Sequence, residues 1–349
     1  MLEPKPAPTI DPTPMPEETK SPQPELSPTP TPSPVATGPA AAITLDNLEV
    51  NWVNLTARKE LLRVFDTLTT PVGAYEVIAG PNVIPAQIEE EKRLLDIAAR
   101  MFSGYFKPTK YQVIFFSEKD GAWADQALAT YGGGFPNTIE KEIAKSSNGC
   151  NFAFATRGKN QTPIYYQCMD TRGRYINDKQ TAIHEYFHLV QDHYQGMGKT
   201  PCWVTEGAAQ YFGMALGVDN ADPTGKATLT FTRNLSFAFN PSGDYNLGPN
   251  TNLRDKVETF VGFREVMTLL DQKQVNCLPL AAYAVGSILT EVLIATSGFE
   301  TYMQFVKSFQ SESDWKVAFK KVYGLSSDEF YEKAWPYFKE RLNLAFQSG

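Results

Sequence analysis

The sequence lacks any run of basic residues: its 32 lysines and arginines are scattered among 39 aspartates and glutamates, for a net charge of −7. Nucleic-acid binding relies on clustered cationic side chains that contact phosphates, so we expect no nucleic-acid partner. The N-terminal residues lack a basic segment followed by an apolar one, so we expect any signal or anchor segment to lie outside this sequence. The longest apolar stretch, residues 278–298, carries Glu291 and several hydroxyl side chains, which favours a buried helix over a transmembrane span.

Proline is scarce except at one end of the chain, where 13 of the 25 prolines fall before residue 40 among Thr, Ser, Glu and Ala. Such a composition cannot bury enough apolar surface to fold and favours extended, polyproline-like conformations. We therefore interpret residues 1–42 as a disordered tether and residues 43–349 as the folded domain. A stalk of this kind typically separates a domain from a membrane or cell wall, which predicts a secreted or cell-surface protein. The alternative interpretation is a ligand for proline-binding domains.

Cysteine is also scarce, with four in 349 residues, and no Cys-x-x-Cys spacing suggests a second metal site. Cys150 and Cys168 flank a predicted β-hairpin, whereas Cys202 and Cys277 each precede a predicted helix. Four cysteines permit two disulfides, which persist in exported proteins and are rare in cytosolic ones. Because the stalk indicates export, we expect bridges rather than free thiols, although the sequence does not determine their pairing.

Histidine occurs only three times, at His184, His188 and His193. The first two enclose the motif HEYFH, residues 184–188. On a helix, residues four apart lie on one face, so both imidazoles can bind a single ion. Zinc accepts imidazole nitrogens and carboxylate oxygens, and with three protein ligands it keeps one position for water. His193 points away from this pair at the helical period, and we interpret it as an ordinary, partly exposed histidine.

A second helical stretch follows with the sequence WVTEGAAQYF, residues 203–212, and its Glu206 can supply the third ligand. The residues around HEYFH are mostly apolar, which predicts a buried helix, and buried imidazoles and carboxylates are unfavourable unless a metal or hydrogen bonds satisfy them. The alternative for Glu206 is a solvated charge on an exposed helix face. Asp192 shares the metal-facing side of the first helix and is either a neighbour of the ligands or a solvated carboxylate.

These two motifs resemble those of the gluzincin metallopeptidases, whose HExxH helix is followed by a helix with the pattern W-x-x-E-G-x-A-x-Y/F. The matching residues are Trp203, Glu206, Gly207, Ala209 and Tyr211. The resemblance implies a Zn²⁺ ion bound by His184, His188 and Glu206. It also implies an α+β fold with a thermolysin-like catalytic domain, in which a small mixed-sheet lobe (about residues 43–200) and a mostly helical lobe (about 201–349) enclose the zinc in a cleft. The metzincin pattern HExxHxxGxxH does not fit, because Gln191 and Tyr194 stand where it needs glycine and histidine.

A weaker match is the segment from Tyr283 to Gly286, which is similar to the Y-x-x-G that opens a later helix in aminopeptidase-type gluzincins. In that group the tyrosine stabilises the oxyanion of the reaction, and the alternative for Tyr283 is a core aromatic. One position departs from the family pattern. Gln210 stands four residues after the glutamate ligand, where relatives often carry an acid that hydrogen-bonds a histidine ligand. We therefore expect that contact to be altered or supplied by another residue.

The resemblance implies hydrolysis of peptide bonds, with a peptide or protein as substrate. Zinc makes water acidic enough to supply a nucleophile at neutral pH, and Glu185 beside the first ligand is placed to act as general base on the zinc-bound water. Tyr283 would donate a hydrogen bond to the oxyanion. Aminopeptidase-type relatives hold the free amino terminus with a G-x-M-E-N segment that this sequence lacks, so we expect an endopeptidase. An aminopeptidase of the same superfamily and a non-catalytic extracellular zinc-containing binding module are the alternatives.

Hydrophobic periodicity predicts the elements around these motifs. The predicted elements are a helix at about residues 85–105, a buried strand at 111–117, a hairpin of 151–156 with 163–167, and metal-site helices at about 177–194 and 204–216, the latter capped by Gly217. Five further helices are predicted at 256–270, 280–295, 300–309, 315–323 and 328–346. Residues 43–80 stay unassigned, and residues 226–239 are ambiguous.

Overall fold

The computed structural model describes residues 42–71, 75–132, 138–145, 150, 152–171, 180–217, 253–272, 277 and 281–347. The chain divides into two units, Met1–Thr37 and Gly38–Gly349, and all of the described residues belong to the second. Apart from Ala42, the predicted tether lies outside the described residues, and so does the ambiguous segment 226–239. The disorder of the tether therefore stays a prediction.

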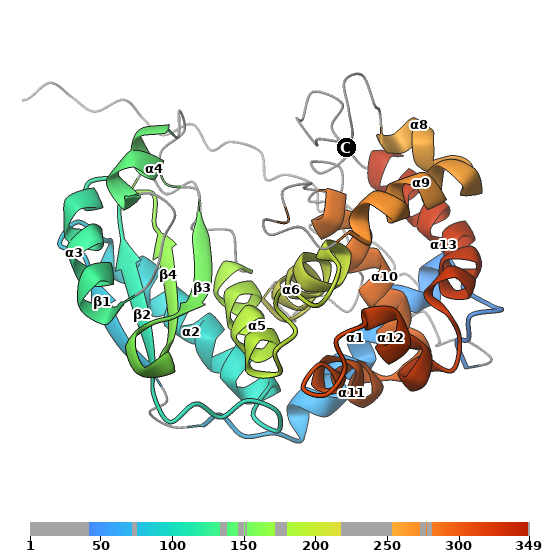
Figure 1. The fold of residues 1–349 in the computed structure, drawn as a ribbon, viewed down its shortest axis with the longest axis horizontal. Helices are drawn as coiled ribbons and strands as arrows, with labels where there is room; N and C mark the ends of the chain where they lie inside the picture. The colour runs from blue at the N-terminus through green and yellow to red at the C-terminus, as the bar shows by residue number, and fades with distance from the viewer. Residues whose placement is uncertain are drawn as a thin grey trace, which may run out of the picture. The chain divides into compact units, whose positions relative to one another are not determined.

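A four-stranded sheet forms one side of the second unit (Figure 1). Its strands are β1 (Tyr75–Ala79), β2 (Tyr111–Phe116), β3 (Ala153–Arg157) and β4 (Pro163–Cys168), arranged in the order β1-β2-β4-β3. β1, β2 and β4 run parallel, whereas β3 is antiparallel to β4 and lies at the edge of the sheet. The predicted hairpin is confirmed, because β3 and β4 pair with each other.

β2 is the central apolar strand of the sheet, and all six of its residues are buried. Alternate side chains point to opposite faces, and each face packs into a separate hydrophobic cluster. The helices of this region are α2 (Pro85–Met101), α3 (Gly121–Tyr131), α4 (Ile139–Lys145) and α5 (Thr181–His193). Val113 and Phe115 join the larger cluster with α2 and α5, and Ile114 and Phe116 join the smaller one with α3 and α4. Burial on both faces explains why the strand reads as a continuous apolar run.

Helices make up the other side of the unit (Figure 1). They are α1 (Val50–Asp66), α6 (Cys202–Gly217), α8 (Leu253–Val257), α9 (Phe260–Leu270), α10 (Ala281–Ser297), α11 (Phe299–Ser308), α12 (Trp315–Tyr323) and α13 (Ser327–Gln347). α10 packs on α6, α1, α11 and α13 and is apolar on nearly all sides, as expected of a central helix. No single helix among the described residues is long and apolar enough to cross a membrane, and α10 with α11 passes that test only as a pair bent by 117°.

Several elements differ from the prediction. The unassigned residues 43–80 contain α1 and β1, and α3 and α4 were not predicted. α1 packs mainly on α10 and so belongs with the helical side, although its residues fall in the range predicted for the sheet lobe. The helix predicted at 256–270 is broken, because Thr259 is extended and its side chain accepts a hydrogen bond from the N–H of Gly262, which starts α9. Gly217 is the last residue of α6 rather than a residue beyond it.

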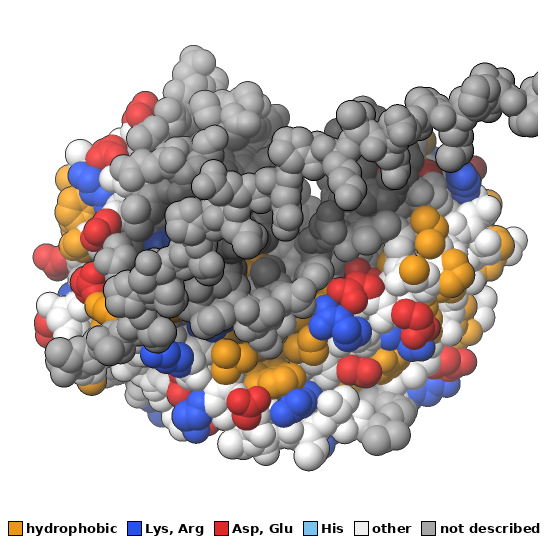
Figure 2. All heavy atoms as spheres, turned by 180° about the vertical axis from the view of Figure 1, so that it is seen from behind, with side chains coloured by type: hydrophobic (Ala, Val, Ile, Leu, Met, Phe, Trp, Pro, Cys, Tyr) orange, Lys and Arg blue, Asp and Glu red, His pale blue; other side chains and the backbone are white. Residues whose placement is uncertain are grey.

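The coarse fold class is nevertheless as predicted. The unit combines a small mixed sheet with mostly helical structure, which is compatible with an α+β fold. The predicted strand at 111–117 corresponds to β2, and the helix at 315–323 is reproduced by α12. Charged side chains of both signs alternate over the described part of the face that Figure 2 shows.

Two disulfides are present, and their pairing is Cys150–Cys168 and Cys202–Cys277. The first joins the segment before β3 to the end of β4. The second joins the first residue of α6 to the segment before α10, so it links two helices that lie far apart in the sequence. The predicted bridges are thus confirmed, and they are consistent with an extracellular protein.

Removing the Cys202–Cys277 bridge should destabilise the protein more than removing the other. Its sequence separation is 75 residues against 18 for Cys150–Cys168, and the loop-entropy model assigns about 4 and about 3 kcal/mol to loops of these lengths. We expect this order of unfolding free energies when the two double alanine variants are compared in urea. A larger loss for the Cys150–Cys168 variant would show that local packing, not chain entropy, sets the effect.

Candidate metal centre

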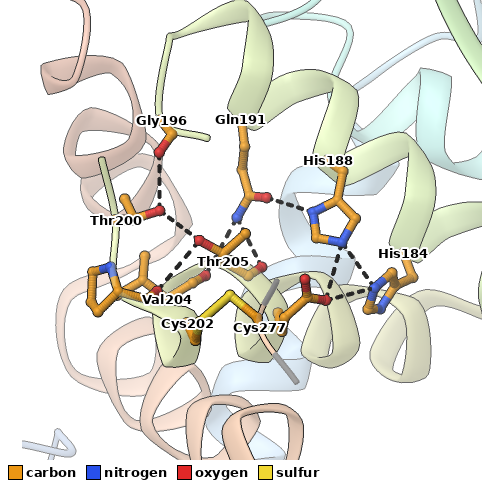
Figure 3. Close-up of a disulfide and its surroundings, with 11 residues drawn as sticks. His184, His188, Gln191, Gly196, Thr200, Cys202, Val204, Thr205 and Cys277 are labelled. Carbon is orange, nitrogen blue, oxygen red and sulfur yellow. Dashed lines mark hydrogen bonds and ion pairs between the residues drawn. A yellow bond between two sulfur atoms is a disulfide. The ribbon is translucent and has the colours of Figure 1, made fainter. Parts of the chain in front are cut away.

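His184 and His188 lie one turn apart on α5 with their rings turned toward each other (Figure 3). Their Nε2 atoms are 3.0 Å apart, and Oε2 of Glu206 on α6 lies 3.3 Å from each of them. Both histidines are buried, and the glutamate is nearly so. Among the described residues, this is the group of donor side chains that could hold a metal ion, and it unites the ligands predicted from the sequence.

The three residues fit a metal ion chemically as well as geometrically. Imidazole nitrogen and carboxylate oxygen are ligands for divalent transition metals. Oε2 of Glu206 is buried without a hydrogen-bond partner of normal geometry, and it lies 3.3 Å from the Nε2 atom of each imidazole. A buried carboxylate oxygen without a partner is costly, and a cation between it and the imidazoles would remove that cost.

The pKa values of the metal-free ligands reflect their mutual attraction. Burial acts to lower the pKa of His188, but the negative charge of Glu206 has the opposite effect and raises it to about 9. Burial likewise acts to raise the pKa of Glu206, but the two imidazoles hold it well below its ordinary range. The site therefore favours a negative carboxylate next to positive charge. A metal cation would take the place of the imidazole proton.

Glu206 is held in place through the start of its helix. Trp203, three residues earlier, is buried and donates its indole N–H to Oδ1 of Asp271 at 3.1 Å. The hydroxyl of Tyr331 on α13 donates to the same oxygen at 2.6 Å. The tryptophan of the W-x-x-E-G motif thus anchors α6 to the end of α9 and to α13, and the glutamate follows three residues later, about one turn along the same side of the helix.

The glycines of the two downstream motifs meet where α6 crosses α10. A Cβ placed on Gly207 would lie 2.2 Å from Cα of Gly286, and one on Gly286 would lie 2.0 Å from the carbonyl oxygen of Trp203. The backbones are therefore in direct contact, which only glycine permits. Since Gly207 follows Glu206 and Gly286 stands one turn after Tyr283, this crossing brings the glutamate and the tyrosine to the same site.

Gly286→Ala should destabilise the protein, although alanine is the better helix former. The gain in helix propensity is about 1 kcal/mol, whereas a methyl group at 2.0 Å from a carbonyl oxygen must push α6 and α10 apart, at a cost of about 1–3 kcal/mol or more. We expect a lower unfolding free energy in urea and a weaker hold on added metal. Gly104→Ala is the control, because nothing lies within 4 Å of a Cβ at that position. A stability gain in Gly286→Ala would contradict the contact.

Tyr283 lies directly against the first ligand. Its ring is stacked on the imidazole of His184, with centroids 5.7 Å apart and planes inclined by 8°. Burial, and then the charge of Glu206, raise its pKa well above the ordinary value, so the hydroxyl keeps its proton. The hydroxyl group of Tyr283, the predicted oxyanion donor, is therefore a hydrogen-bond donor at neutral pH, and its ring lies beside the candidate ligand His184.

Glu185 is buried on α5, on the side that faces the edge strand β3. Its Oε2 has no hydrogen-bond partner, while a hydrogen bond from the backbone of Ala155 on β3 acts on its carboxyl group. Burial raises its pKa, and the positive charge of the two ligand histidines opposes that effect without cancelling it. A carboxylate with a raised pKa and a free oxygen is a suitable proton acceptor near neutral pH.

A cavity of about 490 Å³ opens beside these residues. His184, Glu185 and Tyr283 line one part of it, and Phe152, Ala153, Gln167 and Gln210 line another. Ala153 is the first residue of the edge strand β3, and Gln167 belongs to β4. The predicted ligand, base and oxyanion donor thus line a common cavity next to β3, the edge strand.

The remaining polar residues near α5 have separate roles. Asp192 forms an ion pair with Arg157 of β3 rather than contacting the ligands, and His193 is exposed against Phe106. Gln210 donates its amide to Oε1 of Gln180 at 3.0 Å and makes no described contact with a ligand histidine.

The contact expected of the residue four after Glu206 is supplied by Gln191 instead. Its Oε1 lies 2.8 Å from Nδ1 of His188 (Figure 3). We did not predict this role from the sequence. A signal was available, because a glutamine three residues after the second histidine lies on the same helix face in an otherwise apolar helix.

Comparisons with protein-family models, with curated proteins and with solved structures find no match to this chain. The geometry of the site therefore carries the functional argument.

Proposed function

We propose that the protein is a zinc-dependent peptidase. The observation that carries this proposal is the convergence of two imidazoles and one carboxylate, held close together, with a separate buried glutamate, Glu185, that lines the adjacent cavity. A structural metal site needs only the ligands, whereas a hydrolytic one also needs a base and an open cavity beside them.

Zinc is the metal that we propose for this site. Tetrahedral zinc with ligands at about 2.0–2.1 Å separates neighbouring donor atoms by about 3.3 Å. The three separations here are 3.0, 3.3 and 3.3 Å. Two histidines with one glutamate form one of the ligand sets of catalytic zinc, which leaves a position for water or substrate.

The protein side chains divide the chemistry between them. Zinc, when bound, would supply a Lewis acid that acidifies water and polarises a substrate carbonyl. Glu185 accepts a proton at its free Oε2 and returns it to the nitrogen of the leaving amine. Tyr283 donates a hydrogen bond from its hydroxyl group to the oxygen on which negative charge develops. These are the roles that the resemblance to gluzincins implies, and a thermolysin-like arrangement is part of the proposal.

An extended peptide is the substrate that suits the surroundings. β3 is an edge strand whose outer side pairs with no described strand, and its first residue lines the cavity. A peptide can add to such an edge through backbone hydrogen bonds, which favours cleavage within a chain over removal of a terminal residue. We therefore propose an endopeptidase, and the two disulfides support its action outside the cell.

The test is digestion of a peptide library by the zinc-loaded protein, with and without a chelator. We expect cleavage inside peptides that the chelator abolishes and added zinc restores. Matched peptides with free and acetylated amino termini should be cut equally. Strict dependence on the free amine would indicate an aminopeptidase, and stoichiometric zinc without any cleavage would indicate a binding module.

Tyr283→Phe should separate catalysis from metal binding. The variant keeps the ring that stacks on His184 but loses the hydroxyl, so zinc should stay bound while kcat falls by about 10²–10³. Tyr75→Phe is the control, because its hydroxyl bonds Asp96 away from the site. An unchanged kcat in Tyr283→Phe would leave that tyrosine as a packing residue.

A further inference from the structure

Gln191 connects the two helices that carry the metal ligands. It stands on α5, is 4% exposed, and lies one turn after His188. Its Oε1 is 2.8 Å from Nδ1 of His188, and its Nε2 donates to the carbonyl oxygens of Val204 at 3.3 Å and Thr205 at 3.0 Å (Figure 3). Those carbonyls belong to the two residues that immediately precede Glu206 on α6.

These partners determine which way the amide faces. Two carbonyl oxygens can only accept, so the NH₂ group of Gln191 must face them and its Oε1 must face the imidazole. An acceptor opposite Nδ1 requires that Nδ1 carry a proton. In the neutral imidazole of His188, the lone pair then lies on Nε2, the atom that is grouped with His184 and Glu206.

The backbone of the same residue is held as well. The carbonyl of Gln191 accepts the N–H of Gly196 at 2.8 Å, and the carbonyl of Gly196 accepts the hydroxyl of Thr200 at 3.1 Å. The hydroxyls of Thr200 and Thr205 are 2.6 Å apart, which returns the chain of contacts to α6 (Figure 3). Both the side chain and the backbone of Gln191 are therefore linked by hydrogen bonds to α6, the side chain directly and the backbone through Gly196 and Thr200.

We propose that Gln191 is a positioning residue of the metal site: it selects the Nδ1–H tautomer of His188 and fixes the distance from α5 to the part of α6 that carries Glu206. This inference rests on the proposed metal site, but not on any particular substrate. It predicts two separable effects, because the acceptor oxygen acts on the histidine and the donor nitrogen acts on the other helix.

Two substitutions separate these effects. Gln191→Met keeps the approximate volume and removes both functions, so zinc affinity should fall about 10–100-fold, as is typical when a hydrogen bond to a ligand is lost. Gln191→Glu keeps an acceptor for Nδ1 but loses the NH₂ group, so zinc affinity should fall clearly less than in Gln191→Met while the melting temperature falls. Gln87→Met is the matched control, because Gln87 is also buried and donates to a backbone carbonyl, that of Asp170, outside the site.

Affinity is measured with Zn²⁺ in competition with a chromogenic chelator, and the absorption spectrum of the Co²⁺-loaded protein reports the ligand geometry. Equal affinities for Gln191→Met and Gln87→Met would overturn the proposal, and so would a loss in Gln191→Glu as large as that in Gln191→Met. If the unmodified protein itself holds no zinc, the proposed function fails rather than the role of Gln191.

Nitrogen NMR of the unmodified, zinc-loaded protein gives a second measurement that does not depend on how any variant folds. The protein has three histidines that contribute imidazole signals. The ¹⁵N chemical shifts of their Nδ1 and Nε2 atoms distinguish a protonated nitrogen from a metal-bound one. We expect a proton on Nδ1 of His188 and zinc at Nε2. Zinc at Nδ1 would exclude the proposed hydrogen bond to Gln191.

Discussion

His184→Ala and His188→Ala are each expected to give a chain that retains no zinc after dialysis and cleaves no peptide. Each substitution removes one of only three donor atoms, and the loss should exceed the roughly 10–100-fold that is typical of contacts outside the ligand set. Without the ligand, Glu206 also loses one of the two imidazole nitrogens that lie 3.3 Å from its Oε2. The measurement is elemental analysis of the dialysed proteins together with a peptide assay.

The third histidine provides a control for this experiment. His193 lies on the same helix but is exposed and packs against Phe106, away from the ligand group. His193→Ala should therefore keep both zinc and activity. Retention of stoichiometric zinc by His184→Ala and His188→Ala would refute the metal site, whereas loss of zinc in all three variants would point to unfolding of α5.

Glu185→Gln is expected to keep zinc and fold while losing nearly all turnover. Glutamine has the same shape but cannot accept a proton, and a positioned general base contributes about 10²–10⁴ in rate. Burial raises the pKa of Glu185, so its carboxylate holds a proton more tightly than in water, and the amide cannot accept one. The readouts are kcat for peptide cleavage, zinc content and the melting temperature.

Asp192→Asn is the matched control for this substitution. Asp192 is a carboxylate on the same helix, but it pairs with Arg157 and not with the ligand group. Its amide variant should lose little activity. Comparable turnover in Glu185→Gln and the unmodified protein would remove Glu185 from the mechanism, and loss of zinc in Glu185→Gln would assign it a role in holding the metal.

The residues of the candidate metal site could be predicted because their arrangement is mostly local. The spacing of His184 and His188 places both on one helix face whatever the rest of the chain does. Glu206 could be predicted from its motif, and the structure shows that its neighbours Trp203 and Gly207 are needed for the contacts of α6 with other helices. Each of these residues lies in a long, strongly apolar helix, for which sequence patterns are most informative.

The missed elements have weaker local patterns. α8 and α9 were predicted as one helix, because apolar periodicity continues through Thr259, while the break depends on its side-chain cap. The sequence pattern of residues 50–66 did not predict α1. This helix is buried mainly by packing on α10, more than 200 residues later in the chain. A local pattern carries no information about such a distant partner.

The sequence by itself determined the candidate ligand set, the glutamate that we propose as the base and the cysteines expected to form bridges, since each depends on residue type and short spacing. Only the tertiary structure decided which cysteines pair, that Gln191 rather than Gln210 contacts His188, and that Tyr283 stacks on His184. The reason is physical: the Cys202–Cys277 bridge, the stacking of Tyr283 on His184 and the hydrogen bonds from Gln191 to α6 join segments that the crossing of α6 with α5 and α10 brings together. That crossing depends on the backbone contact of Gly207 with Gly286, which brings together residues nearly 80 positions apart.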